Sequence, residues 1–412
     1  MTLKLNCLLL LFFLIAAVPA EAQKVLTGID LLERDNFALL SGRRIGLITN
    51  HTGVNSRLET TLDLFKGAKN FRLTAVFSPE HGLKGNFGSG QLYGDSQDSA
   101  AGIKYYSLYG KTQKPTPQML EGLDLLVYDI QDIGVRSYTY ISTMGLAMEA
   151  AAENNVEFVV LDRPNPLGGL RIEGNIVEDN FISFVGRYKI PYVYGLTCGE
   201  LARLLNGERM LNGEIKCKLT VVKMEGWNRF MKFRDTGLIW VPTSPNVPEP
   251  ETPFYLVGTG ILGELAVVGI GITYTIPFET FAAEWINADT LSRHMNNLQL
   301  PGVQFRPITY MPLYGQWEDK TLNGVQIHIT DFDKVNLMLI QFYFIQVEYS
   351  LYPDRNPFDF ATTARINMFD KVCGTDQIRL KLIQRFKVSD IEGYLNKDID
   401  KFRKVSIKYY LY

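Results

Sequence analysis

Residues 123–144 read LDLLVYDIQDIGVRSYTYISTM, and this stretch decides the fold. It opens with a short apolar run formed by Leu123, Leu125, Leu126 and Val127, which is typical of a central strand in a parallel sheet. Polar side chains follow directly, namely Asp129, Gln131, Asp132, Arg136, Tyr138 and Tyr140. Open α/β sheets bind ligands at the carboxyl ends of their strands, so the cluster predicts a site for a polar, uncharged or anionic ligand. A capped strand end with an internal Asp–Arg ion pair is the alternative interpretation.

The first half of the chain alternates strand-like and helix-like segments, which predicts βαβ units and a parallel sheet. We expect strands at 44–49, 73–77, 123–129 and 158–161. We expect helices at 60–66, 142–154 and 197–208, the last opened by a capping box of Thr197 and Glu200. The sequence therefore predicts a Rossmann-like α/β domain.

Each predicted strand ends in polar residues. The four clusters are Asn50 and His51; Glu80 and His81; Asp129, Gln131 and Asp132; and Asp162, Arg163 and Asn165. Any one of them could be ordinary turn chemistry. Because parallel strands end at the same edge of a sheet, the four together predict one shared binding site.

Glu80 is the candidate catalytic residue. It follows Pro79 and an apolar strand, so a partly desolvated carboxyl would favour its protonated form, as a general acid requires. A structural carboxylate paired with His81 or Arg136 is the alternative. His81 would orient Glu80 or bind a hydroxyl, or else be an ordinary buried histidine.

A second carboxylate is available in Asp129 or Asp132, and glycosidases normally need two. Arg136 and Arg163 can each fork onto a carboxylate of a ligand, or onto a neighbouring aspartate of the chain.

Several cofactor and partner classes lack support. The chain has no GxGxxG after its first strand, no GxxxxGK[ST] and no GxSxG, and no Cys/His spacing suggests zinc. We therefore expect no cofactor and no metal. With 42 basic and 44 acidic residues the net charge is -2, which gives no support for a nucleic-acid partner.

Residues 1–22 are predicted to be a signal peptide, with a lysine before an apolar run at 8–18 and an Ala-Glu-Ala cleavage signal at 20–22. The run is shorter than the roughly 20 residues of a membrane-spanning helix. We expect an exported, periplasmic protein without a membrane anchor after cleavage. Cys198, Cys217 and Cys373 are too few for a disulfide framework, although one bridge is possible.

A proline-rich connector at 240–253 predicts two domains: a Rossmann-like catalytic domain at 23–245 and a smaller α+β domain at 246–412. In the second domain we expect buried strand or turn structure at 256–275. Further strands are expected at 325–330, 339–347 and 404–411, and helices at 288–298, 358–372 and 376–386.

Longer segments surround the strand ends. They are GLITNHTG at 46–53, FSPEHGLKG at 77–85, YSLYG at 106–110, residues 128–144, LDRPNP at 161–166, GLT at 195–197 with GELA at 199–202, DTGL at 235–238, and WVP at 240–242 with SPN at 244–246. Through them the chain resembles the NamZ-type exo-β-N-acetylmuramidases. The resemblance implies a site in the cleft between the two domains and release of terminal N-acetylmuramic acid from peptidoglycan fragments. Glu80 would be the catalytic carboxylate.

The chain departs from this family in one stretch. Members typically carry Ser-Glu-Gly-Arg-Gly-Thr shortly before Pro-Phe-Glu, whereas here GIGITYT at 269–275 precedes Pro277-Phe278-Glu279. We therefore expect a divergent member, acting on the same or a related amino sugar. The rival hypothesis is a non-catalytic periplasmic protein that binds glycans or muropeptides. A metal-dependent phosphoesterase has only the acidic strand ends in its favour.

The resemblance leaves the mechanism open. Asp129 or Asp132 would stabilise the transition state or position water, or the 2-acetamido group of the substrate would act as nucleophile. Asn50, Arg136 and Arg163 would bind hydroxyls and the lactyl group.

Overall fold

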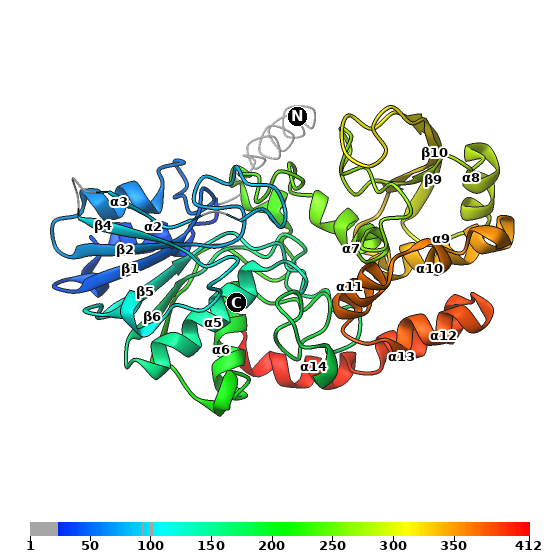
Figure 1. Cartoon of the computed structure of the whole chain (residues 1–412). Helices are drawn as coiled ribbons and strands as arrows, with labels where there is room; N and C mark the ends of the chain where they lie inside the picture. The colour runs from blue at the N-terminus through cyan, green and yellow to red at the C-terminus, as the bar shows by residue number, and fades with distance from the viewer. Residues whose placement is uncertain (1–23, 93, 99–101) are drawn as a thin grey trace, which may run out of the picture.

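The computed structural model describes residues 24–92, 94–98 and 102–412, so the predicted signal peptide lies outside the described residues. Figure 1 shows an α/β lobe that carries the large sheet and a second lobe built from the later part of the chain. Within the described ranges, no helix combines the length and the apolar character needed to cross a membrane.

The first lobe is built on a seven-stranded sheet in the order β3-β4-β2-β1-β5-β6-β7. The strands are β1 (Arg44–Thr49), β2 (Arg72–Ser78), β3 (Ser96–Asp98), β4 (Ile103–Ser107), β5 (Leu125–Asp129), β6 (Glu157–Leu161) and β7 (Leu219–Val222). Only the edge strand β3 pairs antiparallel with its neighbour. The six parallel strands follow the Rossmann order, with the direction of winding reversing between β1 and β5. The predicted α/β fold is confirmed.

Side chains alternate between two apolar layers because successive residues of a strand point to opposite faces. Ile45 and Leu47 of β1 pack into the cluster that also holds α2 (Gly28–Arg34) and α3 (Thr61–Gly67). Ile48 points to the cluster formed by α5 (Tyr140–Glu153) and α6 (Cys198–Gly207). Burial on both faces explains the continuous apolar runs that predicted these strands.

The predicted capping box of α6 is confirmed. The side chain of Thr197 accepts a hydrogen bond from the backbone N–H of Glu200, and the Glu200 carboxylate accepts one from the backbone N–H of Thr197.

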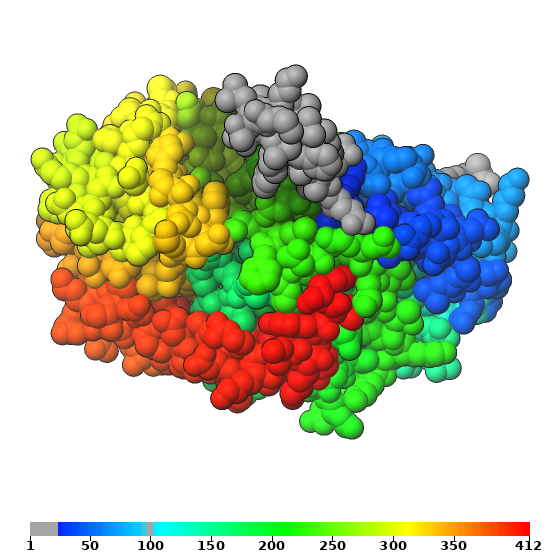
Figure 2. Space-filling view, turned by 180° about the vertical axis from the view of Figure 1, so that it is seen from behind, coloured from blue at the N-terminus to red at the C-terminus, as the bar shows by residue number. Residues whose placement is uncertain are grey.

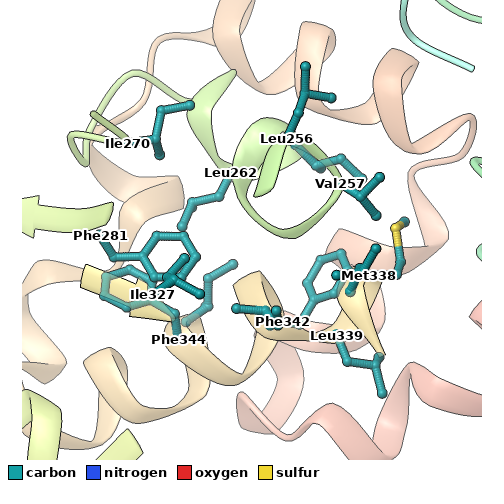
Figure 3. Packing of buried hydrophobic residues seen from close by; sticks show 14 of the residues in the cluster. Leu256, Val257, Leu262, Ile270, Phe281, Ile327, Met338, Leu339, Phe342 and Phe344 are labelled. Atoms are coloured by element: carbon teal, nitrogen blue, oxygen red, sulfur yellow. The ribbon is translucent and has the colours of Figure 1, made fainter. Parts of the chain in front are cut away.

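The second lobe has a three-stranded antiparallel sheet in the order β8-β10-β9. Its strands are β8 (Thr280–Ala283), β9 (Val303–Tyr310) and β10 (Leu322–Ile329). Its helices are α7 (Thr252–Gly263), α8 (Ala288–Asn297), α9 (Leu337–Leu351), α10 (Pro357–Phe360), α11 (Thr363–Cys373), α12 (Gln377–Arg385), α13 (Glu392–Asn396) and α14 (Ile399–Ser406). Figure 3 shows the centre of its core, where Phe281 of β8 stacks on Phe344 of α9 with ring centroids 4.4 Å apart.

Three predictions for this lobe are wrong. Residues 339–347 lie in helix α9, not in a strand, because a helix that is apolar on all sides is stable where every side is buried. Residues 404–411 belong to α14 and a short 3-10 helix, Ile407–Tyr409. In the apolar, glycine-rich segment 256–275, which was predicted to be strand or turn, residues 256–263 lie in helix α7, which begins at Thr252 with a proline in its first turn.

The end of the chain returns to the first lobe. Phe402 of α14 belongs to the same core as α5 and α6. The C terminus lies beside these helices in Figure 1, and Figure 2 shows the last residues, in red, against the green surface of the first lobe. Helix α14 and the final residues therefore fasten the second lobe to the first.

Glu348 of α9 is a buried carboxyl in the core of the second lobe, only 1% exposed. Neither of its oxygens has a hydrogen-bond partner of regular geometry. Burial raises the pKa of Glu348 from its ordinary 4.5 to about 8, although the indole of Trp285 opposes the rise. The folded state therefore binds this proton more tightly than the unfolded state, and stability falls as pH rises from about 4.5 to about 8.

We expect Glu348→Gln to raise the free energy of unfolding at pH 7 by roughly 1–3 kcal/mol, because a neutral amide removes the cost of ionisation. Urea unfolding at a series of pH values checks this. The gain should vary with pH across that range, whereas the exposed control Glu318→Gln should give little change at any pH. A gain independent of pH would contradict the account.

Candidate active site

The polar ends of β1, β2, β5 and β6 come together at the carboxyl edge of the large sheet. Hydrogen bonds run between these ends: the Thr52 hydroxyl accepts from the backbone of Gln131, and the Gln131 side chain donates to the carbonyl of Pro164. This edge includes the point between β1 and β5 where ligands of such sheets bind. The structure thus places the four predicted clusters side by side.

Glu80 lies two residues beyond the end of β2 and is 6% exposed. Its Oε2 accepts a hydrogen bond from the Thr139 hydroxyl at 2.6 Å, and its Oε1 accepts one from the backbone N–H of Gly90 at 3.0 Å. The Ser89 hydroxyl lies 3.5 Å from the same Oε1. The carboxylate is therefore held by donors from two different segments of the chain.

The backbone turns sharply just after Glu80. His81 has a φ of 71° and Gly82 a φ of 75°, a conformation that a side chain disfavours. The Nδ1 of His81 lies 2.8 Å from the carbonyl of Phe87, which ties the histidine to the loop that covers Glu80. Backbone strain of this kind is concentrated at functional sites.

His51 is held in one tautomer. Its Nε2 lies 2.6 Å from the carbonyl of Pro242, which can only accept, so Nε2 carries the proton. Burial lowers the pKa of His51, and the neighbouring His81 lowers it further. The ring is therefore neutral, and its buried Nδ1 is an acceptor without a partner in the described chain.

Asn50 is a matching donor at the end of β1. Its side-chain oxygen accepts from the backbone N–H and the hydroxyl of Thr52, which fixes the orientation of the amide. The buried Nδ2 has no partner among the described residues. Unpaired buried polar atoms are costly, and a ligand is one way to satisfy them.

Asp129 and Arg163 form an enclosed ion pair. The guanidinium of Arg163 donates to both carboxylate oxygens of Asp129, at 2.5 and 2.9 Å, and the hydroxyl of Thr61 also donates to Asp129. Asp129 is completely buried. The internal ion pair, which was the alternative interpretation, is what the structure shows. It leaves Asp129 no free oxygen for a second catalytic role.

Asp132 differs from Asp129 in having one unused oxygen. Its Oδ2 accepts from the backbone N–H of Gly134 at 2.7 Å and from the Tyr194 hydroxyl, while its buried Oδ1 has no partner. Burial raises the pKa of Asp132 to about 6, although hydrogen bonds from Tyr194 and from the backbone of Gly134 and Ile133 oppose the rise. A desolvated carboxyl with a free oxygen is a typical functional group.

Arg136 was predicted to bind a ligand, but the structure gives it an architectural position. It is fully buried, and its guanidinium donates to the carbonyls of Asn175 and Ile190 in the first lobe and of Val372 and Cys373 in α11. Burial lowers its pKa to about 10. Arg136 therefore joins the two lobes and is not open to a ligand.

Asp162 is likewise enclosed, in contrast to the predicted binding role. Its carboxylate accepts from the hydroxyl of Thr197, the backbone N–H of Gly199 and the hydroxyl of Tyr412. Burial raises its pKa to about 6. The hydroxyl of Tyr412 therefore stabilises the end of β6 through Asp162.

Three other predicted residues divide between a structural position and a pocket. Asn165 bonds to the backbone of Leu196 and Leu167, so its role is structural. Gln131 and Arg163 border a narrow pocket next to the connector residue Val241.

Tyr138 is half-buried, and its hydroxyl donates to that of Thr243 at 2.8 Å. Thr139, Tyr109 and Thr243 also belong to the site but were not selected from the sequence. Tyr109 and Thr139 lie within segments that carried the family resemblance, and Thr243 lies between two of them, so the resemblance was the available signal.

A larger hollow lies elsewhere between the lobes. It has a volume of about 600 Å³, and its lining includes Leu170, Phe230 and Arg403. None of the predicted site residues lines it. Its cations are engaged in ion pairs or backbone contacts, for example Lys232 with Asp333 at 2.7 Å, so it lacks a free charge for an anionic ligand.

Two further observations concern the chemistry that the site could support. Among the described residues, no group of three or more His, Cys, Asp or Glu side chains is arranged to hold a metal ion. Cys198, Cys217 and Cys373 are buried and unbridged.

Comparison with known proteins assigns the family. The profile described as "Exo-beta-N-acetylmuramidase NamZ, N-terminal" matches residues 45–251, and the corresponding C-terminal profile matches residues 254–412. The chain therefore belongs to the NamZ family of exo-β-N-acetylmuramidases, a family of glycoside hydrolases.

Individual relatives agree with this. The chain is 43% identical to the peptidoglycan β-N-acetylmuramidase NamZ of Bacillus subtilis (strain 168), over 95% of this chain and 92% of that protein. A crystal structure of a DUF1343 family protein from Bacteroides fragilis NCTC 9343 is 54% identical, with a TM-score of 0.90 over 94% of this chain and 99% of that one. A second such protein from the same organism is 26% identical, with a TM-score of 0.75 and the same coverage.

We expect Tyr412→Phe to lower the free energy of unfolding by about 1–3 kcal/mol, because it removes one donor from the buried Asp162 carboxylate and the acceptor of the Met224 backbone N–H. Chemical denaturation checks this. The matched control is Tyr314→Phe, which removes an exposed hydroxyl that donates to the carbonyl of Ile272. Equal, small losses in both variants would show that the terminal tyrosine does not lock β6.

Proposed function

We propose that this protein is an exo-acting glycoside hydrolase that releases terminal β-linked N-acetylmuramic acid, or a related amino sugar, from peptidoglycan fragments. The observation that carries the proposal is the Glu80 carboxylate, held by donors at the carboxyl edge of the sheet in a chain of the NamZ family. The B. subtilis relative is named for the same reaction on peptidoglycan.

Glu80 is the general acid in this proposal. Its protonated carboxyl gives a proton to the glycosidic oxygen as the bond to the sugar breaks, and the charge that remains on Glu80 is stabilised by the Thr139 hydroxyl. The Ser89–Gly90 segment lies on the carboxylate, so the sugar must displace these contacts to reach it.

Asp132 is the second carboxylate in our proposal, because Asp129 is committed to Arg163. The free Oδ1 of Asp132 could bind the water or the 2-acetamido N–H of the substrate, and either role needs the ionised form. The two aspartates thus divide between a structural and a chemical role because their partners differ.

The unpaired atoms at the end of β1 are the proposed sugar-binding groups. The Nδ2 of Asn50 can donate to a hydroxyl or carbonyl oxygen, and the Nδ1 of His51 can accept from a hydroxyl. Gln131 and Tyr138 lie along the same edge and are proposed to border the sugar.

We further propose that residues 1–22 direct export and that the protein acts in the periplasm, where peptidoglycan fragments arise. The sequence pattern of residues 1–22 supports this. A pure binding protein has only the altered stretch before Pro277 in its favour. That stretch forms a turn in the second lobe, where Tyr274 stacks on Tyr310 at 4.8 Å.

We expect Glu80→Gln to reduce hydrolysis of the disaccharide MurNAc-GlcNAc by about 10²–10⁴-fold, since it removes the proton donor but keeps the shape. Release of free MurNAc by wild type and variant is measured by chromatography. Glu59→Gln, at an exposed position, is the control and should keep full activity. Undiminished release by Glu80→Gln would overturn the assignment, and no release by folded wild type would favour pure binding.

We expect the wild-type rate to fall as pH drops through about 6, because Asp132 then takes up a proton and loses its ionised form. This acidic limb should disappear in Asp132→Asn, whose residual activity should be far lower at every pH. Rates of MurNAc release from pH 4.5 to 8 check both points. An unchanged limb in the variant would assign it to another group.

A further inference from the structure

The inference concerns Tyr109, which stands beside Glu80 because of strand register. Strands β2 and β4 run parallel, with Ser78 opposite Ser107, and the backbone N–H of Leu108 donates to the carbonyl of Ser78 at 2.9 Å. Glu80 and Tyr109 each lie two residues beyond these paired serines. The two side chains therefore leave neighbouring strand ends at the same level of the sheet.

The position of Tyr109 is fixed from both sides. The Ser107 hydroxyl donates to the carbonyl of Tyr109 at 3.1 Å and accepts from its backbone N–H at 3.3 Å, which closes a tight turn after β4. The Tyr109 ring packs against Phe184, with ring centroids 6.0 Å apart. The phenol is thus a placed group, not a freely rotating surface side chain.

The hydroxyl of Tyr109 interacts with the Glu80 carboxylate and with the backbone of Gly90, the same residue whose N–H donates to Glu80. Burial raises the pKa of Tyr109, and the charge of Glu80 raises it further. The phenol therefore keeps its proton and faces Glu80 as a donor.

Tyr140 is another tyrosine whose pKa is raised by the charge of Glu80, in addition to burial. Its hydroxyl donates to the carbonyl of Thr243 at 2.6 Å, so its proton is already engaged. His81 is another titratable neighbour, and it is tied to the carbonyl of Phe87. Tyr109 thus differs from these two neighbours because its phenol interacts with the Glu80 carboxylate itself.

We propose that Tyr109 is a positioning residue that stabilises the Glu80 carboxylate formed in the bond-breaking step. This rests on the proposed function of Glu80. As the glycosidic bond breaks, its electron pair stays on the leaving oxygen and the proton moves there from Glu80. The carboxylate left behind gains a donor from Tyr109, which itself keeps its proton throughout. Such charge-assisted hydrogen bonds are the strong ones.

The test compares two substrates in the variant Tyr109→Phe. The disaccharide MurNAc-GlcNAc needs its leaving oxygen protonated, whereas 4-nitrophenyl β-MurNAc has a leaving group that departs largely unaided. We expect kcat on the disaccharide to fall about 10- to 100-fold with little change in KM, and kcat on the nitrophenyl glycoside to change far less.

The ratio of the two kcat values is independent of the fraction of folded enzyme, so a folding defect cannot imitate the result. Tyr105→Phe, on the same strand, is the matched control and should leave the ratio unchanged. Equal losses on both substrates would overturn the role of Tyr109. If Glu80→Gln is inactive on the disaccharide, equal losses in Tyr109→Phe remove only the inference about Tyr109. If Glu80→Gln stays active, the proposed function fails as well.

Discussion

The buried ion pair between Arg163 and Asp129 is the interaction on which the site depends. It joins the ends of β5 and β6, and through the contact of Arg163 with the carbonyl of Val54 it also holds the loop after β1. The Thr49 hydroxyl completes the link by donating to the backbone carbonyl of Asp129. Removing one member would leave an uncompensated buried charge, which typically costs about 3–5 kcal/mol.

Around this fixed frame, the remaining polar groups have unequal surroundings. Glu80 is surrounded by donors, while Asp132 is desolvated and keeps one oxygen free. Carboxyl groups in different environments can take different roles in one site. Asn50 and His51 add one free donor and one free acceptor at the adjacent strand end. The proposed roles of these residues therefore depend on which of their polar atoms already have a hydrogen-bond partner and which do not.

Much of the sheet was predictable from the sequence, because strands buried on both faces are continuous apolar runs, as in β1 and β5. The location of the site at the carboxyl edge of the sheet was predicted from the polar residues that follow those runs. The distinction between Asp129 and Asp132 was not predictable, since it depends on Arg163, 34 residues further along the chain. Helix α9 was mistaken for a strand because its aromatic and β-branched residues favour strands, and only burial on all sides makes the helix the stable choice.

The central claim is that the sugar is cleaved at the carboxyl edge of the sheet, against Glu80. The most direct measurement is a crystal structure of the Glu80→Gln protein soaked with MurNAc-GlcNAc. Our account predicts the glycosidic oxygen within hydrogen-bond distance of the amide at position 80, with the Ser89–Gly90 contacts displaced. Disaccharide bound instead in the hollow beside Leu170 and Phe230, with the sheet edge unchanged, would contradict it.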